Sequence, residues 1–259
     1  MRMMKKVLGT VTVLALSVSL LAGCGSTAVS PVSSTASTAA ESTTSSVVSE
    51  TTSAAADENA AAAAQLLNDL TGSYQELWPV ILADEYQQTW LDDCTALVGE
   101  ENAEAAFEKL SSMVTSDVYG EDAVEAYANG GGAYFCGFTN DLATLTFDGE
   151  TSTISGTDKD GNVLFSHTYH YIGMEPVHGL YEFESDDADS GEFTYFFLAP
   201  DTSAETYHIE FRYGSDAEAL SQYDTGEYAY WLASGISTDC DQTMIDNCIE
   251  LFCTENLAG

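Results

Sequence analysis

The feature that most constrains the fold is a series of short strand-like runs in the second half of the chain. The runs are rich in aromatic and β-branched residues, and turn signals such as Asp148-Gly149 and Asp160-Gly161 separate them. They lie at 133–138, 142–147, 151–155, 163–172, 179–184, 193–198 and 206–213. Short strands repeated at this spacing predict an antiparallel barrel or sandwich.

The clearest alternation lies at 205–213, where aromatic and polar side chains take turns along the run. The aromatic face consists of Tyr207, Ile209, Phe211 and Tyr213, and the polar face of Thr206, His208, Glu210 and Arg212. A period of two is typical of a half-buried strand. The polar face needs water, a ligand or an ion beside it, because unpartnered polar groups are costly to bury.

Helical patterns flank the strand series on both sides. Residues 58–97 favour helix as a whole, with separate segments at 73–82 and 84–98. Further helices are expected at 101–113 and 238–257, and a short capped helical turn at 214–220. Pro79 fits a first turn or a kink of its segment. The expected fold class is therefore mainly β, an antiparallel barrel or sandwich with N-terminal helices and a C-terminal helix.

Two motifs resemble those of the ZinT family of zinc-recruiting domains. The early motif is DLTGSYQELWP at 69–79, which is similar to the family pattern DWxGxWQxVYP. The late motif holds, in the family's order, Ala199-Pro200, Tyr207-His208-Ile209, Gly214-Ser215-Asp216, Ala219-Leu220 and Tyr228-Ala229-Tyr230-Trp231. The resemblance spans about 65–259 and implies a calycin-like, lipocalin-shaped antiparallel barrel with helices outside, as one domain at 56–259.

The N-terminal segment is predicted to be a lipoprotein signal peptide at 1–23. Lys5 and Lys6 precede a short apolar run, and LAGC at 21–24 resembles the bacterial lipobox. We expect cleavage before Cys24 and lipidation of its thiol, which would anchor the protein to the bacterial cell membrane on the extracytoplasmic side. The alternative is an ordinary signal peptide followed by an unmodified cysteine.

Residues 24–55 are predicted to be a disordered tether, because they are almost wholly Ser, Thr, Ala and Val. Loss of the signal peptide would leave three basic residues against 42 acidic ones, a difference of −39. Such a charge excludes nucleic acid and anionic lipid as electrostatic partners, and it attracts divalent cations.

Five cysteines remain after Cys24, in a compartment that would permit disulfides. They are Cys94, Cys136, Cys240, Cys248 and Cys253. The odd count leaves at least one thiol outside any intramolecular pair, and the pairing itself stays open. No CxxC pattern occurs, so a thiolate zinc site is not expected.

The metal-site candidates are few, because the chain has only four histidines. The resemblance implies a site of three histidines, and the corresponding positions here are Phe196, Thr206 and His208. Glu210 shares the face of His208 and offers an oxygen ligand. The candidate zinc site is therefore His208 and Glu210 with one of His167, His170 and His178. His167 and His170 should point to opposite faces of one strand.

Two functions follow from this reading. The first is an extracytoplasmic lipoprotein that captures zinc or a similar divalent ion and delivers it to a metal-uptake transporter. The second is a calycin-type lipoprotein that has lost the metal site and binds an apolar ligand or another protein, with an aromatic cavity around Phe196. No Ser-His-Asp order, phosphate loop or HExxH helix occurs, so an enzyme is not expected.

Overall fold

The computed structural model describes residues 47–200 and 208–258, and the side chains from Glu58 onward. The predicted signal peptide and Cys24 lie outside these residues, as do most of the predicted tether and Thr206. The first helix begins at Val47, so residues 47–55, expected in the tether, are helical instead. Ala54 and Ala55 at the end of this stretch favour helix, and the helix continues into the alanine-rich residues 60–64.

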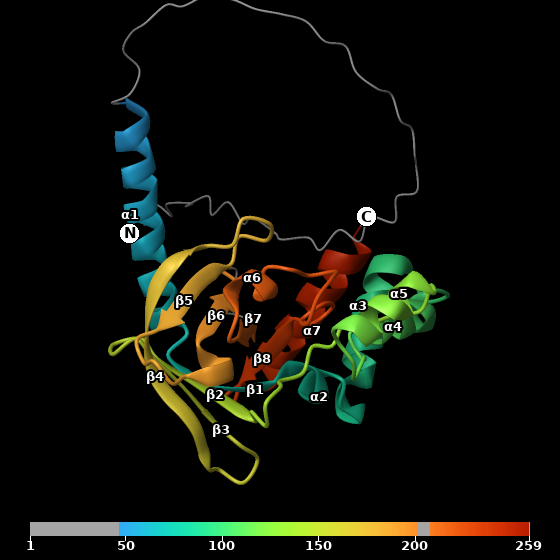
Figure 1. Cartoon of the computed structure of the whole chain (residues 1–259). Coiled ribbons are helices and arrows are strands. Elements are labelled where there is room, and N and C mark those ends of the chain that lie inside the picture. Colours follow the sequence, from blue (N-terminus) through green and yellow to red (C-terminus); the bar gives the residue numbers. More distant parts are fainter. Residues whose placement is uncertain (1–46, 201–207, 259) are drawn as a thin grey trace, which may run out of the picture.

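Eight antiparallel strands close into a barrel in simple chain order, and the last strand pairs with the first (Figure 1). The strands are β1 (Gly72–Glu76), β2 (Thr144–Asp148), β3 (Thr153–Thr157), β4 (Val163–Met174), β5 (Tyr181–Ser185), β6 (Tyr195–Leu198), β7 (His208–Gly214) and β8 (Ala233–Ser237). Closure leaves no free sheet edge. The predicted fold class, a calycin-like antiparallel barrel with flanking helices, is confirmed.

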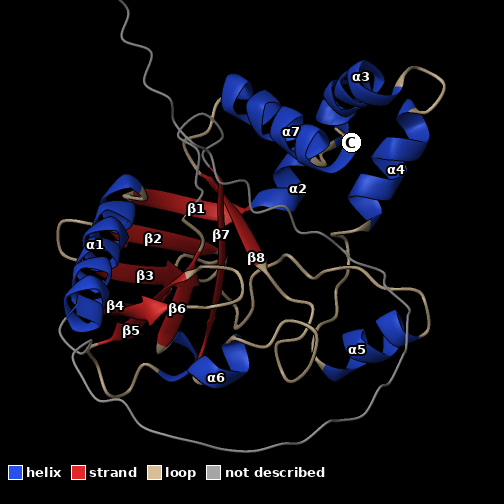
Figure 2. Ribbon diagram, turned by 90° about the horizontal axis from the view of Figure 1, so that it is seen from above, coloured by secondary structure: helices blue, strands red, loops and turns tan. Residues whose placement is uncertain are grey.

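The helices lie outside the barrel (Figure 2). They are α1 (Val47–Asp69), α2 (Leu77–Ile81), α3 (Gln87–Val98), α4 (Ala103–Ser112), α5 (Glu121–Ala128), α6 (Ala217–Leu220) and α7 (Gln242–Leu257), with 3-10 turns at Asp84–Tyr86 and Gly191–Phe193. Helix α1 lies against β2 and β4, whereas α2, α3, α4 and α7 form a second layer next to β8. Within the part of the chain that the structure describes, no helix has the length and apolar character needed to cross a membrane.

Two hydrophobic cores result from this arrangement. Aromatic rings fill the barrel, and those exposed by no more than 2% include Phe147, Phe183, Phe196, Phe211 and Tyr213. The second core lies between the barrel wall and the helical layer, where Trp90, Cys94, Cys248 and Cys253 are all fully buried. The barrel interior is therefore a packed core around Phe196, where the sequence suggested a ligand cavity.

The segment 133–138 is not the strand that was expected. It runs across one end of the barrel and makes only isolated bridges, from Phe135 to Thr115 and to Trp231. Its backbone groups at 134–136 bond to the backbone of Met113, Tyr230, Leu232 and Ser234. At the end of the segment side chains take over, because Glu76 Oε1 accepts a hydrogen bond from the Phe138 N–H at 2.6 Å and the indole Nε1 of Trp231 donates to the Gly137 carbonyl at 2.9 Å. Together these bonds satisfy the backbone groups of the segment without a continuous strand ladder.

Strand β7 is buried on both faces, although the alternation predicted a half-buried strand. Its polar face carries His208, which is 7% exposed, and Arg212, which is fully buried. Arg212 donates hydrogen bonds to the carbonyl oxygens of Leu220, Gln222 and Tyr228. The turn of α6 and the loop after it therefore cover this end of β7, and a buried guanidinium satisfies their carbonyl groups.

Candidate functional site

His170 has the setting that best suits a metal ligand. It lies on the outer face of β4 with a side chain that is 52% exposed, and its cross-strand partner on β5 is Glu184. The ring Nδ1 lies 2.8 Å from Asp186 Oδ1. A carboxylate only accepts hydrogen bonds, so this contact places the proton on Nδ1 and leaves the Nε2 lone pair available.

The second potential donor at this position is the carboxylate of Glu184. Its Oε2 lies 3.9 Å from His170 Nε2, and its Oε1 accepts a hydrogen bond from the Tyr195 hydroxyl at 3.2 Å. Zinc bonds to nitrogen and oxygen are each about 2.0–2.2 Å long, so one ion can contact both donor atoms across this gap. The pair thus offers one nitrogen and one oxygen donor, fewer than the protein ligands of a closed zinc site.

His167 lies three residues earlier on β4 and faces the other side of the strand, as expected. It shares a face with the buried rings of Phe165 and Tyr169, which lie two residues before and after it, and its side chain is 17% exposed. Its Nδ1 lies 2.8 Å from Asp187 Oδ2. Consecutive aspartates at 186 and 187 thus hold the two histidines on opposite faces of the wall, so these histidines do not share one site.

His178 belongs to a separate cluster in the turn after β4. Its ring packs on Tyr223 at 3.7 Å between ring centres, and its Nδ1 lies 3.6 Å from Glu175 Oε2. Glu175 is fully buried and accepts hydrogen bonds from the backbone N–H groups of Val177 and His178. This carboxylate therefore holds the turn in place, and the contacts of His178 are those of a structural residue.

His208 and Glu210 share one face of β7, as the alternation predicted. Their cross-strand partners on β8 are Ile236 and Ser234, and Ile236 is part of the core beneath the helical layer. The pair therefore points under α2 and α7, away from solvent. Phe196, at a position where the family has a histidine, faces the barrel interior instead.

The five predicted ligands thus do not converge in the described part of the chain. No group of three or more His, Cys, Asp or Glu side chains there has the spacing to hold a metal ion. The residues that sequence reasoning missed are Glu184, Asp186 and Asp187. In a chain with 42 acidic residues, nothing in the sequence marks these three as histidine partners.

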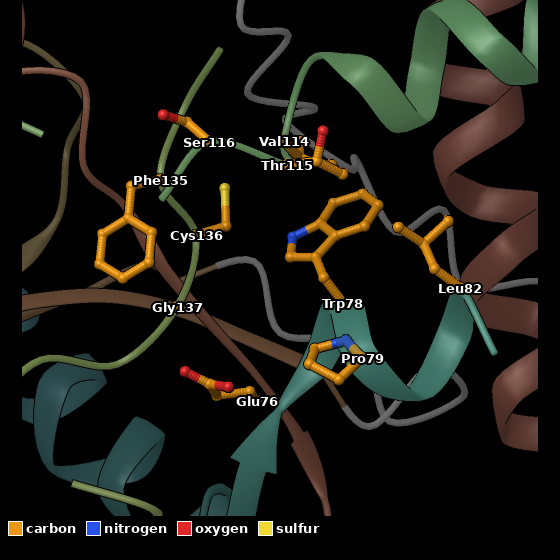
Figure 3. Close-up of a pocket in the computed structure, with 10 residues that line it drawn as sticks. All are labelled: Glu76, Trp78, Pro79, Leu82, Val114, Thr115, Ser116, Phe135, Cys136 and Gly137. Carbon is orange, nitrogen blue, oxygen red and sulfur yellow. The ribbon is translucent and has the colours of Figure 1, made fainter. Parts of the chain in front are cut away.

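A pocket of about 310 Å³ opens between α2 and the segments 114–116 and 135–137 (Figure 3). Its lining residues are Glu76, Trp78, Pro79, Leu82, Val114, Thr115, Ser116, Phe135, Cys136 and Gly137. The indole ring of Trp78 is 6% exposed, and its buried Nε1 has no oxygen or nitrogen partner, only the weakly accepting sulfur of Cys136 beside it. Burial raises the pKa of the Cys136 thiol, so that this side chain stays protonated at neutral pH. The pocket is mainly apolar, with one unused donor.

Several solved structures are similar to this chain, and two of them show what they share with it. No protein-family model matches this sequence, and a search of curated proteins finds no match. The Zn(II)-bound ZinT-like domain of Streptococcus pneumoniae AdcA is 16% identical, with a TM-score of 0.45, over 71% of this chain and 89% of that one. Zn(II)-bound AdcA from Streptococcus pneumoniae is 14% identical, with a TM-score of 0.42, over 72% of this chain and 35% of that one. The chain is thus similar in structure to these two proteins, and its own strand pairing shows a closed antiparallel barrel.

Proposed function

We propose that this chain is an extracytoplasmic lipoprotein, anchored at Cys24, that captures zinc or a similar divalent ion for delivery to an uptake transporter. The observation that carries the metal-binding part is the cross-strand pair of His170 and Glu184, with Asp186 holding the other ring nitrogen. Zinc is the first ion to test because the sequence resemblance implies it. The strongly negative charge of the whole chain attracts divalent cations.

Two protein ligands suit a carrier better than a permanent structural site. Structural zinc sites close four protein ligands around the ion, whereas an open site keeps water that a receiving protein displaces. His170 and Glu184 are 52% and 38% exposed, so both are accessible to a partner. Capture followed by transfer needs such exchangeable binding.

The test is a zinc titration by calorimetry on the chain from residue 25 onward, in a Cys240→Ser background. Cys240 is the one cysteine among the five that is not buried, and its removal prevents binding to a free thiol. We expect His170→Ala to weaken zinc binding at least about tenfold, which is about 1.4 kcal/mol. Glu184→Gln should weaken it less, because the amide oxygen keeps one neutral donor.

Matched controls distinguish a site at His170 and Glu184 from binding at other histidines and from diffuse binding. His178→Ala removes a histidine from a structural setting and should leave zinc affinity unchanged. A loss of affinity in His208→Ala with none in His170→Ala would move the site to β7 and contradict our assignment. Equal binding by all variants, abolished by added salt, would mean diffuse attraction to the acidic surface.

The anchor needs its own experiment. Replacing Cys24 with Ala and fractionating cells should move the protein from the membrane to the soluble extracytoplasmic fraction, because the acylated thiol would be lost. Unchanged membrane association would refute the lipid anchor without touching the zinc site.

A second candidate function is binding of a small apolar ligand in the pocket beside α2. The observation that favours it is the Nε1 of Trp78, which is buried in the pocket lining without an oxygen or nitrogen partner. An unpaired buried donor costs about 1–3 kcal/mol, and a ligand whose carbonyl oxygen meets Nε1, once the indole ring turns toward the pocket, would recover that cost. An aromatic ketone such as acetophenone is a suitable probe. Its binding should weaken in Trp78→Phe, which keeps the ring and removes the N–H, while Trp90→Phe should bind as wild type.

A further inference from the structure

Two cysteines far apart in the sequence meet in the core of the helical layer. Cys94 lies in α3 and Cys253 in α7, and their sulfur atoms are 3.8 Å apart. Both residues are fully buried, and the two helices pack directly against each other (Figure 2). Among the five cysteines of the described residues, Cys94 and Cys253 are the pair whose sulfur atoms lie in contact.

We infer that Cys94 and Cys253 form a disulfide when the chain folds in the presence of a thiol–disulfide oxidant. A disulfide bond is about 2.05 Å long, so the sulfur atoms must approach by roughly 1.8 Å. Side-chain rotation and a small shift of either helix can share this movement. The pairing itself does not depend on the proposed function. Formation of the bond in cells rests on the extracytoplasmic location proposed above, because oxidants are present there.

The reaction is an exchange with an external disulfide such as oxidised glutathione. The thiolate of one cysteine attacks that disulfide, forms a mixed disulfide and releases one glutathione thiolate. The thiolate of the other cysteine then attacks the protein sulfur of the mixed disulfide and releases the second glutathione. Two protein thiols are oxidised, one glutathione disulfide is reduced to two thiols, and the two protons pass to the released thiolates or to solvent.

The order of events follows from burial. Burial raises the pKa of both thiols, that of Cys253 strongly, and the nearby carboxylate of Asp93 acts in the same direction. In the folded protein these thiols are therefore weak nucleophiles that external oxidants do not reach. The bond should form during folding, as α7 docks on α3 while the sulfur atoms are still accessible.

The bond would join the N-terminal helices to the C-terminal helix around the whole barrel. Strands β2 to β8 lie between the two cysteines in the sequence, so the closed loop contains most of the domain. Cys136, Cys240 and Cys248 would remain as thiols.

The experiment refolds the chain from residue 25 out of denaturant with mixed oxidised and reduced glutathione, followed by alkylation under denaturing conditions and mass spectrometry. We expect three alkylated cysteines and one linked peptide pair containing Cys94 and Cys253. Five alkylated cysteines, or a link between any other pair, would overturn the inference.

Variants make the test independent of a folding failure. Cys253→Ala should lose the link, and Cys240→Ser should keep it. Adding a reductant during unfolding should lower the melting temperature of the wild type and of Cys240→Ser, but not that of Cys253→Ala. A link that forms in the test tube, with five free thiols in protein taken from cells, would contradict the proposed location and not the pairing.

Discussion

The guanidinium carbon of Arg212 lies 4.2 Å from the centre of the Tyr223 ring, inside the loop that covers β7. Burial lowers the pKa of Arg212 and raises that of Tyr223. Because each neighbour partly offsets the desolvation of the other, the cation–π contact and the carbonyl hydrogen bonds act together. This single cation fastens the loop after α6 to the barrel wall.

Replacing Arg212 with Met should destabilise the protein strongly. The carbonyl groups of Leu220, Gln222 and Tyr228 would lose their shared donor, and the expected loss is about 3 kcal/mol in the free energy of unfolding. Urea denaturation of the chain from residue 25 measures this loss. Lys159→Met is the matched control, because Lys159 is exposed and should change stability by less than about 0.5 kcal/mol. Equal midpoints for the two variants would contradict the role given to Arg212.

Asp93 makes the stability depend on pH. Burial raises its pKa, and the carboxylates of Glu250 and Asp246 raise it further. The folded state therefore favours protonated Asp93, so the stabilising contribution is complete below the ordinary pKa and is lost as the pH rises through the raised one. We expect Asp93→Asn to have a higher melting temperature than the wild type at pH 7, with a difference that shrinks as the pH falls toward 4.

The control for that experiment is Asp122→Asn, at an exposed position on α5 that is not among the charges acting on Asp93. It reduces the net charge by the same amount, so it corrects for general repulsion in an acidic protein. If both variants stabilise the protein equally at every pH, the effect belongs to net charge and not to the buried carboxylate.

Two buried tryptophans should respond differently to replacement by phenylalanine. The Nε1 of Trp90 donates to the Ile81 carbonyl oxygen at 2.7 Å, whereas that of Trp78 has no oxygen or nitrogen partner. Trp90→Phe leaves a buried carbonyl group unpaired, while Trp78→Phe removes an unpaired donor. We expect Trp90→Phe to be less stable than Trp78→Phe by about 1–2 kcal/mol in chemical denaturation. The reverse order would show that packing outweighs the hydrogen bond.

Gly149 allows α1 to approach the turn between β2 and β3. A Cβ atom at this position would lie 2.4 Å from Asn68 Cα and 2.6 Å from the Leu67 carbonyl oxygen. Because both contacts are with backbone, the helix would have to move, and Gly149→Ala should cost about 1–3 kcal/mol. Hydrogen exchange should show lost protection in α1. Gly131→Ala has open space around it and serves as the control.

The sequence by itself determined the elements whose pattern is local. The apolar spacing of Ile245, Cys248 and Ile249 predicted the C-terminal helix, and the structure buries these residues in α7. Asp216 caps α6 by accepting hydrogen bonds from two backbone N–H groups, within the capped turn expected at 214–220. The alternation of 163–172 and of 205–213 likewise predicted β4 and β7. In each case neighbouring residues carry the signal, because helix and strand periods repeat within a few positions.

Only the tertiary structure decided the elements that depend on distant partners. Residues 72–76 were predicted to be helical in large part, yet they form β1, because β2 and β8 supply backbone hydrogen bonds on both sides. Strand β8, with the sequence ASGIS, shows no strong strand pattern and is held between β7 and β1. The segment 133–138 shows the opposite case, since its strand-like residues find no ladder and close the barrel end.

The contacts of the candidate site also depend on residues that are distant in the sequence. His170 meets Glu184 through the register of β4 and β5, and a bulge between Tyr171 and Gly173 shifts that register further along the pair. Asp186 reaches His170 because it follows directly after β5. Cys94 meets Cys253 only where α3 packs on α7. Such meetings depend on hydrogen-bond register and helix packing across the whole fold, and no local spacing in one chain encodes them.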